Sequence, residues 1–135
     1  MSTIDLLLGL DANKIQRPTQ EVEIKRLTDI AGSPVIFKCQ ALDSDTYNEI
    51  QKNAVDIDSK GGITGLDVGE VQTFMVLAGV STPDLKDTGL LSHYGAVTPK
   101  ELLPKLLLPG EITTLFNLIN NLSGFGEGAV ENIKN

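Results

Sequence analysis

The stretch TPKELLPKLLLPGEITTLFNLINNL, residues 98–122, restricts the fold of this chain more than any other part of it. Thr98 before Pro99, with Glu101 three residues after Thr98, predicts a helix that begins with a capping box. Pro104 predicts a kink or an early end of that helix, because its ring crowds the carbonyl four residues back. A second helix is expected from Pro109, with an apolar stripe of Ile112, Leu115, Phe116, Ile119 and Leu122. Glycines at 124, 126 and 128 are expected to end it.

Helix signals also fill the middle of the chain. Asp43 can cap one helix, and its apolar stripe is Tyr47, Ile50 and Ala54. Asp67 can cap another, which ends at Gly79 and has an apolar face wide enough to predict a central position. A shorter helix is expected over residues 88–94.

Two runs with period-two alternation precede these helices. The first begins at Glu21 in EVEIKRL, and the second is VIFKCQAL, where Val35, Phe37, Cys39 and Ala41 fall on one face. A Gly-Ser-Pro break separates the runs, which predicts an antiparallel hairpin with one face buried. The expected fold class is therefore α+β, with an N-terminal β-hairpin packed on a mainly α-helical domain.

The length of 135 residues predicts a single domain over the whole chain. We expect an N-terminal arm at 1–18, the β-hairpin at 19–42, the helical part at 43–123 and a flexible tail at 124–135. With no Trp and few other aromatic residues, the core of such a domain must be aliphatic.

Charge and composition argue against several classes of partner. The net charge of −7 opposes nucleic-acid binding, since the basic residues are scattered and few aromatic rings could stack on bases. The opening residues lack the basic flank of a signal peptide, and nothing approaches the length of a membrane span. We therefore expect a soluble cytosolic protein that contacts neither nucleic acid nor membrane.

The segment DIDSKGGITGLD, residues 56–67, resembles a calcium loop of the EF-hand type. Asp56, Asp58 and Asp67 stand at loop positions 1, 3 and 12, with a glycine at position 6. Lys60 at position 5 puts an ammonium group where a ligand oxygen belongs, and Asp67 is shorter than the usual Glu. The favoured interpretation is a linker in which Asp67 caps the next helix, and a small calcium-binding module is the alternative.

Catalytic chemistry is not visible in the sequence. His93 is the single histidine and lies at a helix end, where a surface or capping role is favoured over general base catalysis. Cys39 is the single cysteine and falls on the apolar face of a strand, where a free thiol behaves as a small hydrophobe. We expect no enzyme, no catalytic residue, no cofactor and no metal.

Two apolar runs exceed what one buried stripe requires. They are LLLGL near the N terminus, in a short helix that Ser2 or Thr3 can cap, and LLPKLLLPGEI. Core packing is the favoured interpretation of both, and docking of another protein is the alternative. The candidate residues for such docking are Leu7, Leu8, Leu107 and Phe125.

The chain resembles the XkdN-like tail assembly chaperones of long-tailed phages and of PBSX-type prophages in Gram-positive bacteria. The resemblance is carried by EVEIKRL, PVIFKCQALDSDTYNEIQ, LLSHYGAVTPKELLPKLLLPGEI and LINNLSGFGEGAVENIKN. It runs almost from end to end, and the segment 56–66 departs from it, in a stretch of variable length.

The resemblance implies a non-catalytic function in virion morphogenesis. Such a chaperone binds the tape measure protein, keeps it soluble in the cytoplasm of the bacterial host, and is absent from the mature virion. The tail tube protein is a second partner that the resemblance suggests, through a longer frameshifted product. Homo-oligomerisation and the partner-binding surface stay open at this point.

Overall fold

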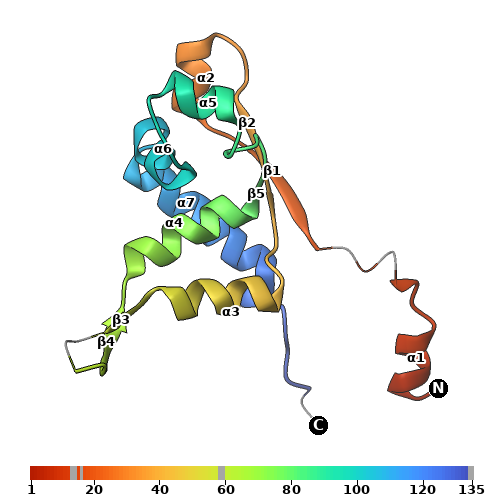
Figure 1. Cartoon of the computed structure of the whole chain (residues 1–135). Helices are drawn as coiled ribbons and strands as arrows, with labels where there is room; N and C mark the ends of the chain where they lie inside the picture. Colours follow the sequence, from red (N-terminus) through yellow and green to blue (C-terminus); the bar gives the residue numbers. More distant parts are fainter. Residues whose placement is uncertain (13–14, 16, 58–59, 134–135) are drawn as a thin grey trace.

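The computed structural model describes residues 1–12, 15, 17–57 and 60–133. The described elements, in chain order, are α1 (Thr3–Leu8), β1 (Thr19–Glu23), α2 (Lys25–Ala31), β2 (Ile36–Gln40), α3 (Ser44–Asn53), β3 (Val55–Ile57), β4 (Ile63–Leu66), α4 (Val68–Gly79), β5 (Val80–Thr82), α5 (Thr88–His93), α6 (Pro99–Leu106), α7 (Pro109–Asn120) and a terminal π-helical turn, η2 (Asn121–Phe125). Helices α3, α4, α6 and α7 lie beside a small sheet, and α1 stands apart from them (Figure 1). The α+β class expected from the sequence is confirmed.

The sheet has three antiparallel strands in the order β1-β2-β5. Val22 of β1 lies opposite Phe37 of β2, so the predicted hairpin is confirmed. The predicted buried face is confirmed too, since Phe37, Cys39 and Ala41 are all almost fully buried.

The connection between β1 and β2 corrects the prediction. The sequence suggested an alternating run as far as Leu27 and turn residues after it, whereas Lys25–Ala31 form helix α2, which ends at Gly32 with a φ of 76°. Glycine tolerates this left-handed conformation at no steric cost, which makes it a common helix terminator. The alternation before Gly32 therefore stops at Ile24, and the chain turns helical before the Gly-Ser-Pro break.

Three short strands, β3, β4 and β5, lie inside the part expected to be helical, residues 43–123. Val80–Thr82 continue directly from α4 and pair with β2 as the edge strand β5. The segment expected to be a linker contains β3 and β4, which form an antiparallel hairpin with Asp56 opposite Gly65. Strands of three or four residues are too short for their alternation to be recognised in a sequence, and pairing with a neighbour decides them.

The predicted caps Asp43, Asp67 and Thr98 are all found at N-cap positions, and Asp67 and Thr98 also make the side-chain capping hydrogen bond. Asp67 accepts a hydrogen bond from the backbone N–H of Glu70 at 3.1 Å, which confirms it as the N-cap of α4. Thr98 accepts from the N–H of Glu101 at 3.2 Å and caps α6. The second half of the predicted capping box is different, because the Glu101 carboxylate accepts from the N–H of Val97 instead of that of Thr98.

Proline governs the junction of α6 and α7. Pro104 lies inside α6, which ends at Leu106, and α7 restarts at Pro109 after a bend of 118°. The predicted early end and restart are therefore confirmed. The bend lets Leu103 and Leu107 on one side of it and Leu115 on the other enter the same buried cluster.

The core is aliphatic, as the shortage of aromatic residues suggested. It joins β2 to α4, α6 and α7, and its most buried large side chains are Phe37, Met75, Leu102, Leu103, Leu115 and Ile119. Helices α4 and α7 approach closely at Gly79, where a Cβ atom would lie 2.5 Å from Cδ1 of Ile119 on α7. Residues of the hairpin and of the helical part thus share one core.

Candidate interaction surface

Helix α1 presents apolar side chains to solvent. The carboxylate of Asp5 accepts hydrogen bonds from the backbone N–H and the hydroxyl of Ser2, and the Ser2 hydroxyl accepts from the N–H of Asp5 at 3.2 Å. This capping box holds the pKa of Asp5 below its ordinary value. No residue of α1 is buried, and Ile4, Leu7 and Leu8 are 67, 60 and 79% exposed.

The favoured interpretation of the N-terminal leucine run as core is therefore wrong. Leu7 and Leu8, two of the candidate docking residues, lie on an exposed helix apart from the rest of the described chain (Figure 1). The sequence could not separate the two interpretations, because both place leucines on one side of a helix.

The other two candidate docking residues have opposite positions. Leu107 is 2% exposed and belongs to the buried cluster, so its side chain is core and cannot contact a partner. Its position follows from the bend after α6, which turns the extended residue Leu107 inward. Phe125 is 60% exposed, and its ring lies against Tyr47 with a centroid distance of 5.1 Å.

A groove between α3, α4 and the start of α6 has a volume of about 490 Å³. Its apolar lining comprises Ile50, Phe74, Leu77, Ala78 and Pro99, and Thr46, Lys86, Thr98 and Lys100 complete it. Sequence reasoning did not identify this groove. The signal available was the wide apolar face of α4, which one packing contact cannot fully cover.

Lys100 lies at the rim of this groove and contacts two neighbouring side chains. Its ammonium group pairs with Glu70 and lies 5.6 Å from the centroid of the Phe74 ring. Hydrogen bonding to Glu70 raises the pKa of Lys100, so the rim keeps a positive charge at neutral pH. The groove thus combines an apolar floor with basic residues at its edge.

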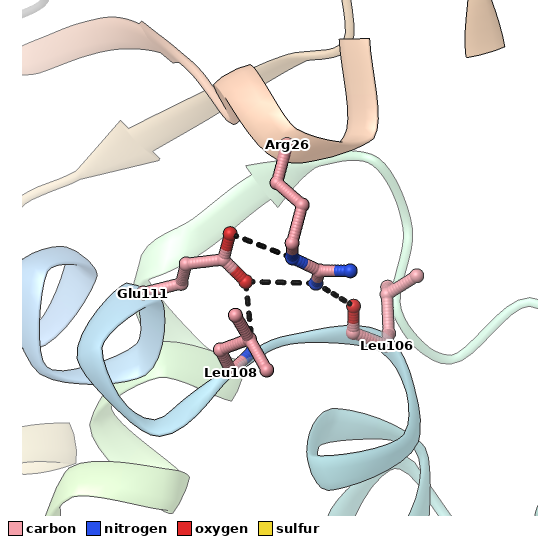
Figure 2. Close-up of polar contacts among 4 residues, drawn as sticks. All are labelled: Arg26, Leu106, Leu108 and Glu111. Atoms are coloured by element: carbon pink, nitrogen blue, oxygen red, sulfur yellow. Dashed lines mark hydrogen bonds and ion pairs between the residues drawn. The ribbon is translucent and has the colours of Figure 1, made fainter. Parts of the chain in front are cut away.

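A second polar cluster joins α2 to the break between α6 and α7. The Arg26 guanidinium on α2 donates to both carboxylate oxygens of Glu111, at 3.1 and 2.9 Å, and to the carbonyl of Leu106 at 2.9 Å (Figure 2). The same carboxylate accepts from the N–H of Leu108 at 2.7 Å. The bonds from Arg26 lower the pKa of Glu111, against a smaller opposite effect of burial.

This cluster is structural, because both carboxylate oxygens of Glu111 accept hydrogen bonds from other parts of the chain. It stabilises the break between α6 and α7 by occupying a carbonyl at the end of one helix and an N–H at the start of the next. No local sequence signal predicts the pair, because Arg26 and Glu111 are separated by 85 positions.

The calcium candidates do not come together as a described site. Asp58 lies outside the described residues, and of Asp56 the structure describes the backbone, which is in β3. The carboxylate of Asp67 is engaged in capping α4. Across the described ranges, no group of three or more His, Cys, Asp or Glu side chains could hold a metal ion.

The two residues considered for reactivity, His93 and Cys39, lie in different surroundings. His93 is exposed at the end of α5, with its ring edge against Tyr94 at a centroid distance of 4.9 Å. Cys39 is fully buried, and desolvation raises the pKa of its thiol to about 11. Its role as a small hydrophobe in the core is confirmed.

Within the described residues, no single helix has the length and apolar composition to cross a membrane. One pair, Pro99–Leu106 with Pro109–Phe125, reaches them only in combination and across a bend of 118°.

The comparisons with known proteins identify a similar fold and a matching family. No curated protein matches the chain. The crystal structure of the protein YqbN has a similar fold, with a TM-score of 0.60 and 24% sequence identity over 80% of this chain and 87% of that one. The family described as "Phage XkdN-like tail assembly chaperone protein" matches residues 4–135, nearly the whole sequence. The chain therefore belongs to the XkdN-like family of phage tail assembly chaperones.

Proposed function

We propose that this chaperone binds the phage tape measure protein and keeps it soluble in the cytoplasm of the bacterial host until the tail is assembled. The observation that carries the proposal is the family match over residues 4–135. The proposed action is reversible binding, without a chemical step and without a cofactor. The chaperone is not expected to remain in the mature virion.

The surface of the molecule supports such a role. Exposed apolar side chains on α1, the apolar groove beside α4 and the ring of Phe125 offer contacts for the apolar side of a partner helix. The net charge of −7 makes complexes of this chain with an apolar partner repel one another, and this repulsion opposes aggregation.

Co-expression with the tape measure protein of the same phage or prophage tests the proposal. The soluble yield of that protein should rise, and the two proteins should co-purify. The variant Leu7→Asp with Leu8→Asp should reduce both effects, since it places charge on an apolar contact surface that the fold of the described chain does not use.

Ile30→Asp is the matched control, because Ile30 is an exposed aliphatic residue on α2, at 74% exposure, outside α1 and the groove. It should leave the soluble yield unchanged. An unchanged yield with the unmodified chaperone, and no co-purification, would overturn the proposed function.

The tail tube protein is proposed as a second partner. The test is co-purification of this chain with tube protein in the presence and absence of the tape measure protein. Tube protein that is retained only with the tape measure protein would argue against a direct contact.

A further inference from the structure

The contacts of helix α1 with the other described residues do not explain why it is helical. It has six residues, and isolated helices shorter than about 12 residues are marginal in water. Its capping box supplies the hydrogen bonds at its start, but none of its side chains is buried by any other described residue. Packing of an apolar face is the usual source of stability for so short a helix, so α1 needs a surface to pack on.

The apolar face of α1 is narrow and regular. Ile4, Leu7 and Leu8 are spaced as i, i+3 and i+4, so they lie on one side of the helix. At a rise of about 1.5 Å per residue the helix is about 9 Å long, and it projects three branched aliphatic side chains from that side. A matching site must therefore be short, apolar and open at the surface.

The groove beside α4 meets these requirements. Phe74, Leu77 and Ala78 of α4, with Ile50 of α3, form an apolar floor of partly buried side chains. Its volume of about 490 Å³ is comparable with that of pockets that bury a small ligand, about 300–1,000 Å³. The side chains of one face of α1 are groups of this kind.

Charge favours the same pairing. Lys86 and Lys100 lie at the rim of the groove in a chain whose net charge is −7. Asp5 stands on α1 next to its apolar face, and its pKa is held below the ordinary value, so it stays ionised. Attraction to Lys86 would favour this carboxylate at the rim and give α1 a preferred orientation, whereas the charge of Lys100 is already paired with Glu70.

Helix α1 lies apart from the body of the chain (Figure 1). Pro18 accepts a backbone hydrogen bond from Ala41, and Thr19 pairs with Gln40, so the chain is held at the end of β2 before it reaches β1. Beyond this anchor α1 lies clear of α3, α4 and α6 (Figure 1). An arm of this kind can exchange between protomers, and in a two-fold pair each arm fills the groove of the other chain.

We propose that α1 of one chain docks in the α3–α4 groove of a second copy, with Ile4, Leu7 and Leu8 against Phe74, Leu77 and Ala78. The contact is between two copies of this chain and needs no other phage protein. It uses surfaces that are also proposed for the tape measure protein, so the two contacts would compete for α1 and the groove. The experiments below use the purified chain alone, so their failure is distinguishable from failure of the proposed function.

Site-specific disulfide cross-linking of the purified chain tests the pairing. One variant carries Leu7→Cys and the other carries Lys86→Cys, so a disulfide between them can form only between two chains. The native Cys39 can stay, because it is fully buried. Oxidation of the mixture should give a mixed dimer, which its mass identifies. The control is a mixture of Leu7→Cys with Ser33→Cys, since Ser33 is exposed and lies outside the lining of the groove. The mixed dimer should form several-fold faster in the first mixture than in the control.

Two outcomes would overturn the proposal. The first is equal rates of cross-linking in the two mixtures, which indicates random collision. The second is a chain carrying both Leu7→Cys and Lys86→Cys that closes on itself at high dilution, which indicates docking within one chain.

Mass measurement in solution provides an independent reading. Light scattering should show the mass rising with concentration from 14.5 kDa toward twice that value. Leu7→Asp with Leu8→Asp should keep the protein monomeric, whereas Ile30→Asp should associate like the unmodified chain. A constant mass of 14.5 kDa for the unmodified chain at all concentrations would also overturn the proposal.

Discussion

Gly79 is a residue at which α4 packs closely against α7. A Cβ atom there would lie 2.5 Å from Cδ1, and 2.7 Å from both Cγ atoms, of Ile119. Ile119 is fully buried, so its side chain cannot rotate away into solvent. The lack of a side chain at position 79 thus sets the distance between α4 and α7.

The change Gly79→Ala should destabilise the protein by about 1–3 kcal/mol, the typical cost of an overpacked core. Helix propensity alone predicts the opposite sign, since alanine is the better helix former. Urea denaturation followed by circular dichroism measures the difference in the free energy of unfolding.

Gly110→Ala is the matched control, because no atom lies within 4 Å of the Cβ position at Gly110 in the first turn of α7. Its effect should be neutral or slightly stabilising. Adding Ile119→Ala to Gly79→Ala should cost less than the sum of the two single changes, because the clash is removed. Additive costs would contradict the close approach.

Other single residues were predictable because their effect is local. Asp67 and Thr98 cap helices through the N–H groups three positions later, and such a bond depends only on a few residues of the chain. The shift of the Glu101 carboxylate to Val97 could not be foreseen, because it depends on how the chain enters α6.

At the scale of elements, Asp67 between β4 and α4 has two candidate roles, as the N-cap of α4 and as a calcium ligand, and substitutions can distinguish them. As an N-cap, its side-chain oxygen is what matters, so Asp67→Asn should keep the stability of α4 and Asp67→Ala should lose about 1 kcal/mol. Thermal unfolding in a calcium-free buffer measures both variants. Equal losses in the two would argue against the cap.

The calcium alternative predicts a different pattern. A carboxylate ligand binds calcium far better than an amide, so Asp67→Asn would then abolish any thermal shift caused by added calcium. We expect no such shift in the unmodified chain. A calcium-dependent rise in its melting temperature that Asp56→Ala removes would establish the calcium-binding module instead.

Elements whose pattern extends over several turns were predictable, and short ones were not. Residues 68–79 and 109–120 carry apolar stripes long enough to identify the helices α4 and α7. Helix α2 and strand β5 have seven and three residues, and their states depend on Gly32 ending one and on β2 pairing with the other. The β3–β4 hairpin escaped prediction for the same reason.

At the scale of the whole molecule, the Arg26–Glu111 pair ties the N-terminal hairpin region to the C-terminal helices (Figure 2). The pKa of Glu111 is lower in the folded protein than in the unfolded chain, mainly through the bonds from Arg26. Such a group contributes its stability above the unfolded pKa and loses it as the pH falls through the folded pKa. The pKa of a glutamate in an unfolded chain is about 4.3. The loss of stability therefore begins near this pH and continues as the pH falls further.

Replacing Arg26 by Met should lower the stability at neutral pH and flatten the part of the acid loss that Glu111 contributes. Urea denaturation at a series of pH values from neutral to acid measures this slope. Lys25→Met is the matched control, since it removes the same charge from the neighbouring, exposed position. The Lys25 variant should keep the steep acid slope, and equal slopes in the two variants would show that the pair does not couple to folding.

The sequence by itself determined the fold class, the starts of α4 and α6, the proline-governed break between α6 and α7, and the buried face of β2. Each of these depends on backbone chemistry or on periodicity within a short stretch, so neighbouring residues were sufficient to specify it. The tertiary structure alone decided which apolar residues are core. Leu107 and Leu8 read alike in the sequence, yet the bend after α6 turns Leu107 into the core, while the arm carries Leu8 beyond the reach of any described partner. Burial is a property of the surface that meets a side chain, and that surface comes from residues distant in the chain.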